Sequence, residues 1–207
     1  MSEGIYVDID DVLSRTVERL IDLLETMHAR RVHLEEVRHF DLEKSFDLDE
    51  AEIRAFMDRA HTDAEIEAIE PAHGAAEVLA DWAEAGHSIR LVTGRPPITN
   101  RASRRWLERH AIAHHEIHHL DKWGRPTWNE HGLPAIRFED LHDFGFAFAV
   151  EDSLDTAVRL VEALDVPVAL MDRPWNRDLA GLSRGTRERL VRCRNWEDVA
   201  RFFERRR

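Results

Sequence analysis

Acidic residues directly follow two short apolar runs of the kind that form buried strands. Asp8 and Asp10 follow one run near the N-terminus, and Glu151 and Asp152 follow another that ends at Val150. Carboxylate oxygens are the ligands that hard cations such as Mg²⁺ take in proteins, and a carboxylate is also a nucleophile at neutral pH. At spacing i and i+2, one carboxylate can serve a metal and a reacting atom while the other lies beside the leaving group. These residues therefore predict metal-assisted chemistry at strand ends.

Donor groups follow two further apolar runs. Thr93, Gly94 and Arg95 come after one run, and Lys122 comes after another. Hydroxyl and ammonium groups can hold the oxygens of a phosphoryl group. Each piece has a simpler explanation, since Asp often caps a helix, Thr-Gly-Arg-Pro is a common turn and lysine usually lies at the surface. Their shared position favours one common site, because ligands of open parallel sheets bind at the carboxyl ends of the strands.

Apolar runs alternate with amphipathic segments along the chain, which predicts an α/β fold with a parallel sheet. We expect strands at residues 5–7, 89–92, 116–119, 146–150 and 166–171. We expect helices at residues 17–27, 75–82, 100–110, 154–164 and 196–203, and a weaker one at 136–142. Gly86 is expected to end the helix that begins near residue 75.

These residues, in this order, resemble the four motifs of the haloacid dehalogenase (HAD) superfamily. Val7–Val12 is similar to the first motif, Leu91–Arg95 to the second, Lys122 to the third and Val150–Asp152 to the fourth. The resemblance implies a Rossmann-like parallel sheet flanked by helices, with a small helical cap inserted between the first and second motifs.

The stretch between the first two motifs fits such an insertion. Residues 33–70 contain no glycine, are heavily charged and show helical spacing of apolar residues. We expect residues 1–13 and 71–207 to form the catalytic core and residues 14–70 to form the cap.

The resemblance also implies a mechanism. Asp8 would attack phosphorus to give an aspartyl-phosphate, and Asp10 would protonate the leaving oxygen and then activate water. Mg²⁺ would be held by Asp8, the backbone carbonyl of Asp10 and Asp152, with Glu151 assisting through water. Asp10 needs a raised pKa to act as an acid, and a neighbouring carboxylate can raise it. Dehalogenases of the superfamily lack this second aspartate, so phosphoryl chemistry is the better interpretation.

The phosphoryl group would be held by the second and third motifs. The resemblance gives this role to Thr93, Gly94, Arg95 and Lys122. The chain contains two lysines, and Lys44 lies in the expected insertion, so Lys122 is our choice for the third motif.

Asp11 departs from the pattern, since many relatives have glycine at this position. Its carboxylate can cap the first helix, or it can repel an incoming phosphate.

The insertion, Thr-Gly-Arg-Pro and the segment Met171–Asn176 are similar to the 5′(3′)-deoxyribonucleotidase branch of the superfamily. The resulting hypothesis is a 5′-nucleotidase for small (deoxy)nucleotide monophosphates. A phosphatase for a sugar phosphate or another small metabolite, and a non-catalytic binding protein with the same fold, stay open as alternatives.

Several aromatic and cationic residues are candidates for substrate contacts. Phe40, Phe46 and Phe56 are candidates for stacking on a base, although aromatic residues at helical spacing more often belong to the core. Arg95 can contact the substrate phosphate, and Trp175 with Asn176 can order the loop behind the site.

Five histidines between residues 110 and 119 raise the question of zinc: His110, His114, His115, His118 and His119. No cysteine or acidic pair nearby completes a ligand set. We therefore expect a solvated loop here.

Composition limits the partners. The net charge of −12 disfavours a long nucleic acid, but a small phosphorylated substrate remains compatible because a metal and local cations can reverse the field in one pocket. No apolar run approaches the roughly 20 residues that cross a bilayer, and no secretory signal pattern is evident. The lone cysteine, Cys193, is expected to be structural. We expect a cytoplasmic protein without membrane partners, and a homodimer is an open expectation.

Overall fold

The central element is a six-stranded sheet, seen in a computed structural model that describes residues 4–122 and 135–206. The strands are β1 (Gly4–Val7), β2 (Ser88–Thr93), β3 (Glu116–His119), β4 (Phe146–Glu151), β5 (Val168–Met171) and β6 (Leu190–Cys193). Their order is β3-β2-β1-β4-β5-β6 and every pairing is parallel. The predicted α/β fold with a parallel sheet is confirmed.

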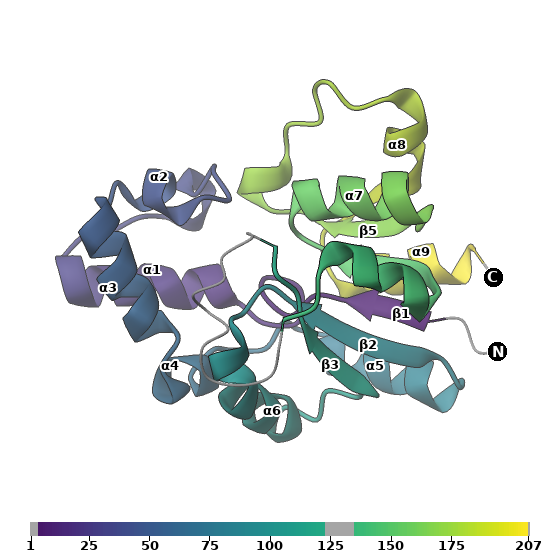
Figure 1. Cartoon of the computed structure of the whole chain (residues 1–207), viewed down its shortest axis with the longest axis horizontal. Helices are drawn as coiled ribbons and strands as arrows, with labels where there is room; N and C mark the ends of the chain where they lie inside the picture. Colours follow the sequence, from purple (N-terminus) through teal and green to yellow (C-terminus); the bar gives the residue numbers. More distant parts are fainter. Residues whose placement is uncertain (1–3, 123–134, 207) are drawn as a thin grey trace.

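Helices cover both faces of this sheet (Figure 1). They are α5 (Ala75–Glu84), α6 (Asn100–Arg109), α7 (Leu154–Leu164), α8 (Arg184–Arg189) and α9 (Trp196–Glu204), joined by the 3₁₀ helices η2 (Pro97–Thr99), η4 (Phe138–Phe144) and η5 (Pro174–Asn176). One apolar cluster joins α5, α6 and α9 to one face of the sheet, and a second joins α7 and η4 to the other. In β1, Ile5 and Val7 belong to the first cluster and Tyr6 to the second, because successive side chains of a strand point to opposite faces.

The segment between β1 and α5 forms a separate group of helices at one end of the molecule (Figure 1). It contains α1 (Thr16–His28), η1 (Leu34–Glu36), α2 (Leu42–Phe46), α3 (Glu50–Ala60) and α4 (Asp63–Glu67). Three of these elements contribute to an apolar cluster of their own, in which the rings of Phe46 and Phe56 meet edge to face at 5.6 Å. We refer to residues 14–70 as the cap segment. Its division from the core at these boundaries stays a prediction.

Phe46 and Phe56, two of the three candidates for stacking on a base, lie in the interior of the cap segment. Phe46 is 2% exposed and Phe56 is 0% exposed, so both fill the interior of the cap segment. Phe40 is 38% exposed and is the one of the three that can meet a ligand.

The structure differs from the sequence-based expectation in two places. The weak helix expected at 136–142 is the 3₁₀ helix η4. The elements α8 and β6 were not expected, because β6 has four residues and two of its side chains are only partly buried. Within residues 4–122 and 135–206, no helix combines the length and apolar character that a membrane crossing requires.

Replacement of a buried side chain tests whether the cap segment can unfold without loss of the sheet. Phe56→Ala should destabilise the cap segment by about 3–5 kcal/mol, because a buried aromatic side chain is lost and a cavity remains. Hydrogen exchange should then accelerate in residues 16–67 while amides of β1, β2 and β4 keep their protection.

The matched control is Met27→Ala on the exposed side of α1, where the side chain is 39% exposed. This change should leave exchange in both regions unaltered. An equal loss of protection in the strands of Phe56→Ala would contradict the division into cap and core.

Candidate active site

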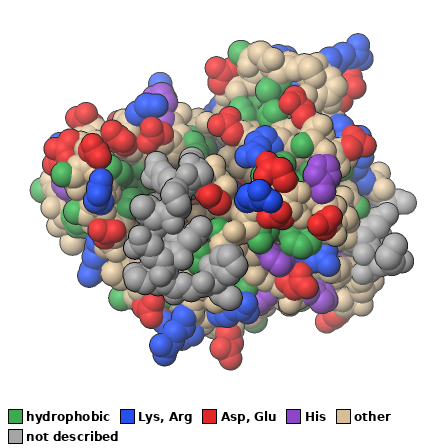
Figure 2. All heavy atoms as spheres, in the orientation of Figure 1, with side chains coloured by type: hydrophobic (Ala, Val, Ile, Leu, Met, Phe, Trp, Pro, Cys, Tyr) green, Lys and Arg blue, Asp and Glu red, His purple; other side chains and the backbone are tan. Residues whose placement is uncertain are grey.

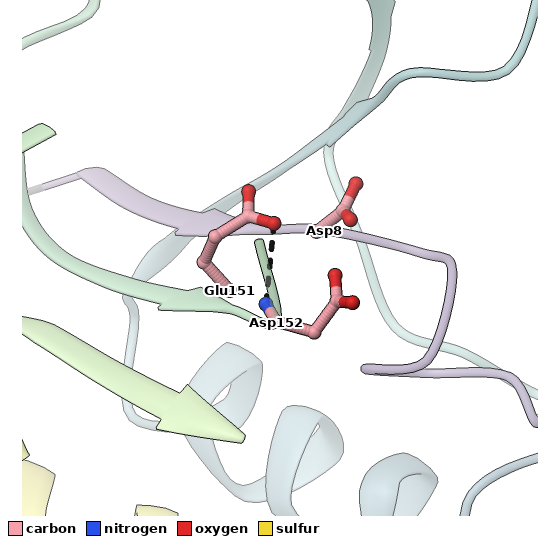
Figure 3. A group of neighbouring side chains, drawn as sticks. All are labelled: Asp8, Glu151 and Asp152. Atoms are coloured by element: carbon pink, nitrogen blue, oxygen red, sulfur yellow. Dashed lines mark hydrogen bonds between the residues drawn. The ribbon is translucent and has the colours of Figure 1, made fainter. Parts of the chain in front are cut away.

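Three carboxylates meet where the neighbouring strands β1 and β4 end. Asp8 follows β1, Glu151 is the last residue of β4, and Asp152 comes next. One oxygen from each lies within 4.8 Å of the other two (Figure 3). All three residues are buried, with exposures of 2%, 0% and 3%. Adjacent parallel strands bring these acids together, as their position after apolar runs predicted.

Both carboxylate oxygens of Glu151 accept hydrogen bonds from neighbouring groups of the protein. Its Oε1 accepts hydrogen bonds from the backbone N–H groups of Asp152 (3.1 Å) and Ser153 (3.0 Å). Its Oε2 accepts one from the Tyr6 hydroxyl at 2.8 Å. Glu151 therefore lies behind the other two acids, and these hydrogen bonds fix the orientation of its carboxylate.

Asp8 is placed differently. Its Oδ2 lies 3.4 Å from Lys122 Nζ, whereas its buried Oδ1 has no hydrogen-bond partner among the described residues. A buried charged oxygen without a partner is costly. The chemistry of the donor set, three carboxylates with one unpartnered oxygen, fits a hard divalent cation such as Mg²⁺.

Charge balance supports the same fit. Burial and the negative charge of Glu151 raise the pKa of Asp8 well above its usual range, against the opposing effect of Lys122. Burial, Glu151 and Asp8 raise the pKa of Asp152 in the same way. Burial alone would lower the pKa of Lys122, but the surrounding carboxylates raise it overall, so it stays charged. One ammonium group faces three acids, and a divalent cation would offset the excess negative charge.

Asp10 is not a member of this group of acids. It accepts hydrogen bonds from Arg95 through Nε (2.9 Å) and Nη2 (2.7 Å), and another from the Thr16 hydroxyl (2.6 Å). Burial raises the pKa of Asp10, but the charge of Arg95 and these hydrogen bonds lower it overall. The expectation of a pKa raised by a neighbouring carboxylate is therefore wrong for this structure, because an arginine holds Asp10 instead.

Arg95 is itself buried, with 4% exposure. Its guanidinium also bonds Ser103 (3.2 Å) and Ser14 (3.3 Å), and its backbone N–H donates to Thr93 Oγ1 at 3.1 Å. Thr93 Oγ1 lies 3.5 Å from Asp10 Oδ2. Arg95 lines the site, but most of its donors are occupied by these groups.

Lys122 reaches the acids across Gly94. A Cβ at Gly94 would lie 3.1 Å from Lys122 Cδ, so this glycine leaves room for the lysine stem. Lys44 instead pairs with Asp41 on the exposed surface of the cap segment at 3.3 Å. Of the two lysines, Lys122 is the one that the fold brings to the acids.

Asp11 caps the first helix. Its Oδ1 accepts a hydrogen bond from the Val17 N–H, in the first turn of α1, at 3.1 Å. Its backbone is left-handed, with φ of 55°, a conformation that Asp adopts more readily than most residues. Burial raises its pKa to about 7, against the effect of Arg173. The capping alternative is therefore the one that the structure supports.

The loop after β5 holds the last acid. Trp175 Nε1 donates to Asp152 Oδ2, and Asn176 Nδ2 donates to the Asp152 carbonyl, both over 2.7–2.8 Å. The expectation that this pair orders the loop behind the site agrees with these contacts. Tyr6 was missed, because a tyrosine within an apolar strand gives no sequence signal of the carboxylate that it meets.

A cavity of about 480 Å³ opens above the acids. Asp8, Asp10, Gly94, Arg95, Lys122 and Asp152 line its charged end. The cap segment supplies a wall in which apolar residues, such as Leu20, Leu23, Val37, Phe40, Ile53, Met57, Ile66 and Ile69, outnumber the polar residues Thr16, Arg19, His39, Asp41, Glu43, His61 and Glu65. Such a cavity can hold an anionic group against the strand ends and a larger apolar group under the cap segment.

The five histidines between residues 110 and 119 are not among the residues that line this cavity. In the described ranges 4–122 and 135–206, the group with potential metal-ligand geometry is Asp8, Glu151 and Asp152. His119 is buried, and its ring nitrogens lie near the Arg95 carbonyl (2.8 Å) and Asn100 Oδ1 (3.1 Å). The expectation of a solvated loop is wrong for His119, because β3 carries this residue into the interior.

Solved structures define the class of this fold. A HAD-superfamily hydrolase from Geobacter sulfurreducens matches with a TM-score of 0.55 at 15% identity, over 98% of this chain and 100% of that chain. Protein Tyrosine Kinase A of Mycobacterium tuberculosis matches with a TM-score of 0.65 at 13% identity, over 97% of each chain. The fold is similar to that of these proteins, one of which is named as a HAD-superfamily hydrolase, and this similarity agrees with the fold that the sequence motifs predicted.

Sequence comparison adds two similarities. A protein of Halalkalibacterium halodurans named "Putative nucleotidase" is 25% identical over 198 residues, which is 96% of this chain and 91% of that protein. A family model described as PITM 1-3, LNS2 domain, matches residues 45–131.

Removal of one acid tests the cation site. Mg²⁺ at a hundredfold excess over its dissociation constant should stabilise the wild type by about 2.7 kcal/mol, a rise in Tm of roughly 5–10 °C. In Asp152→Asn this rise should disappear. In EDTA the variant should melt above the wild type, because one of three crowded charges has gone.

Differential scanning calorimetry with and without Mg²⁺ measures both effects. Asp155→Asn, an exposed position three residues further on, is the control and should respond like the wild type. Equal stabilisation of Asp152→Asn by Mg²⁺ would mean that the cation binds elsewhere.

Proposed function

We propose that this chain is a phosphatase that hydrolyses small phosphate monoesters with the help of Mg²⁺. The observation that carries the proposal is the buried carboxylate of Asp8, whose Oδ1 has no partner in the described part of the chain while Lys122 and Asp152 lie beside it. A carboxylate with one unpartnered oxygen beside the ammonium group of Lys122 can act as a nucleophile. The HAD-like fold supports the reaction class by analogy.

The residues divide the reaction into two displacements. Asp8 forms a bond to phosphorus as the bond between phosphorus and the leaving oxygen breaks, and Asp10 gives its proton to that oxygen. Asp10 then takes a proton from water, whose oxygen attacks phosphorus and releases Asp8 and phosphate. Asp8, Asp152 and the Asp10 carbonyl would hold Mg²⁺, with Glu151 behind them, and the bound cation would offset negative charge on the phosphoryl oxygens. Lys122 and the Thr93–Gly94 loop hold the same oxygens.

The position of Asp10 suits the proton transfers once substrate is present. Arg95 keeps its pKa low in the free protein, and a phosphate dianion brought close would raise that pKa because like charges disfavour ionisation. Arg95 then keeps the carboxylate on the side of the leaving group. We assign Arg95 to the positioning of Asp10 in addition to the predicted contact with phosphate.

Within this class we propose a nucleotidase that acts on small (deoxy)nucleotide monophosphates. The name of the Halalkalibacterium halodurans relative supports this substrate. The apolar wall of the cavity favours a leaving group that has an apolar face, such as a nucleoside base, and disfavours a polyol such as a sugar. Acidic side chains gather over α2 and the start of α3 (Figure 2), which disfavours a long polyanion. A cytoplasmic location and a homodimer stay predictions.

Replacement of the nucleophile tests the proposal. Asp8→Asn should lower phosphate release by at least about 10³-fold, because the amide cannot form the covalent intermediate. EDTA should abolish release by the wild type, and added Mg²⁺ should restore it. Release is measured from an aryl phosphate and from panels of nucleotide monophosphates and sugar phosphates.

Asp22→Asn on the exposed side of α1 is a matched control and should keep full activity. Metal-dependent release by Asp8→Asn would refute the role of Asp8. A folded wild type that binds Mg²⁺ but releases phosphate from none of these esters would favour the binding-only alternative.

Conservative replacement of Arg95 tests its assigned role. Arg95→Lys should lower kcat on the order of 10–100-fold, since lysine cannot present two donors to Asp10 and general acid–base catalysis contributes about 10²–10⁴-fold. KM should change by less than about threefold. Steady-state kinetics on the best substrate of the panel provides both constants.

Arg105→Lys on α6, where the arginine pairs with Glu67 and Asp63, is the control and should leave both constants unchanged. A rise in KM with an unchanged kcat would show instead that Arg95 acts through substrate binding.

A further inference from the structure

The 3₁₀ helix η5 is anchored to the ends of three strands. Asn176 is fully buried, and its Nδ2 donates to the Met171 carbonyl at the end of β5 and to the Asp152 carbonyl after β4, both at 2.7 Å. Its Oδ1 accepts from Arg192 of β6 at 2.6 Å. These bonds fix the backbone of η5 relative to the sheet.

Trp175, the residue before this anchor, touches both the acids and the cap segment. Its Nε1 donates to Asp152 Oδ2 at 2.8 Å. Its ring packs against the apolar cluster of the cap segment and lines the cavity. One side chain therefore connects a carboxylate of the proposed cation site to the helices that form the cavity wall.

A second contact joins η5 to the same helices. Arg177 binds Glu35 of η1 through Nη1 (2.6 Å) and Nη2 (3.2 Å). Both side chains are about half exposed or more, and such surface pairs contribute little. The contact of Trp175 is the partly buried one, and it is the one that reaches Asp152.

We infer that Trp175 is a positioning residue that fixes the carboxylate of Asp152 for the cation and links it to the cap segment, so that cation binding and ordering of the cap segment strengthen each other. The inference rests on the proposed function, since it assumes a cation at Asp8 and Asp152. Hydrogen bonds to a ligating carboxylate set its orientation and tune metal affinity. Coupling between two sites is reciprocal, so a cation that favours one position of the indole also favours the cap contacts made by that ring.

Trp175→Phe tests the inference, because it keeps a ring at the cap contact and removes the N–H donor. Isothermal titration of the whole chain with Mg²⁺ alone should show a dissociation constant about tenfold higher than in the wild type. Hydrogen exchange gives the second readout. Mg²⁺ should slow exchange in residues 34–60 of the wild type, and it should have little effect there in the variant.

Trp106→Phe is the matched control. It also loses an indole hydrogen bond in a buried position, but this bond runs from Trp106 to the Ile69 carbonyl (2.7 Å) and not to Asp152. This change should lower Tm and leave both Mg²⁺ affinity and the Mg²⁺-dependent protection of residues 34–60 as in the wild type. Trp175→Leu is a second variant in case Trp175→Phe does not fold, and because leucine also lacks a donor it should show the same loss of Mg²⁺ affinity.

Unchanged Mg²⁺ affinity in folded Trp175→Phe would overturn the inference, and so would full protection of residues 34–60 by Mg²⁺ in that variant. Failure of the proposed function looks different. It would appear as a wild type that does not bind Mg²⁺ at all, before any variant is compared.

Discussion

The structure depends on the burial of three carboxylates around a single ammonium group. Asp8, Glu151 and Asp152 lie within reach of one another with almost no solvent contact, and Lys122 is the cation beside them. Removal of charge from water is costly unless partners replace the water. The surrounding elements supply these partners for Glu151 through Tyr6 and two backbone N–H groups. For Asp8 one oxygen is left without a partner among the described residues, and this imbalance is the physical basis for the proposed cation and nucleophile.

The sheet order explains how this concentration of charge arises. β1 lies between β2 and β4, so the residues that follow these three strands converge on one edge. Asp10 is only two residues from Asp8, yet it belongs to a separate ionic group with Arg95. Two carboxylates that are close in sequence thus have different surroundings: one is crowded by acids and the other is held by a guanidinium. A proposed nucleophile and a proposed proton donor need this difference, because their charges must respond to substrate in different ways.

The cap segment and the loop after β5 shape the cavity in front of the strand ends, on a fold that does not define an activity. Solved structures of similar fold include proteins named as a hydrolase and as a tyrosine kinase, so the fold alone leaves the direction of phosphoryl transfer open. In this chain the apolar wall of the cavity comes from the cap segment, and Trp175 lies at its junction with the acids. Trp175 is therefore in contact both with an acid at the strand ends and with the apolar cluster of the cap segment.

The sequence by itself determined five of the six strands in the described residues, their parallel arrangement and the residues at their carboxyl ends. These follow from local patterns, because runs such as Ile5–Val7 are apolar on both faces and acids come directly after them. The choice of Lys122 over Lys44 could also be made from its position after a strand. The short strand β6 and the 3₁₀ form of η4 were missed, since four or seven residues carry too weak a pattern.

Only the tertiary structure decided how the side chains at these positions are used. Asp10 meets Arg95, 85 residues away along the chain, and Glu151 meets Tyr6, 145 residues away. Phe46 and Phe56 became interior residues of the cap segment while Phe40 reached the cavity, although all three share the same residue type. Local spacing places a residue on an element, whereas its pKa and its partners depend on segments that only folding brings within a few ångströms.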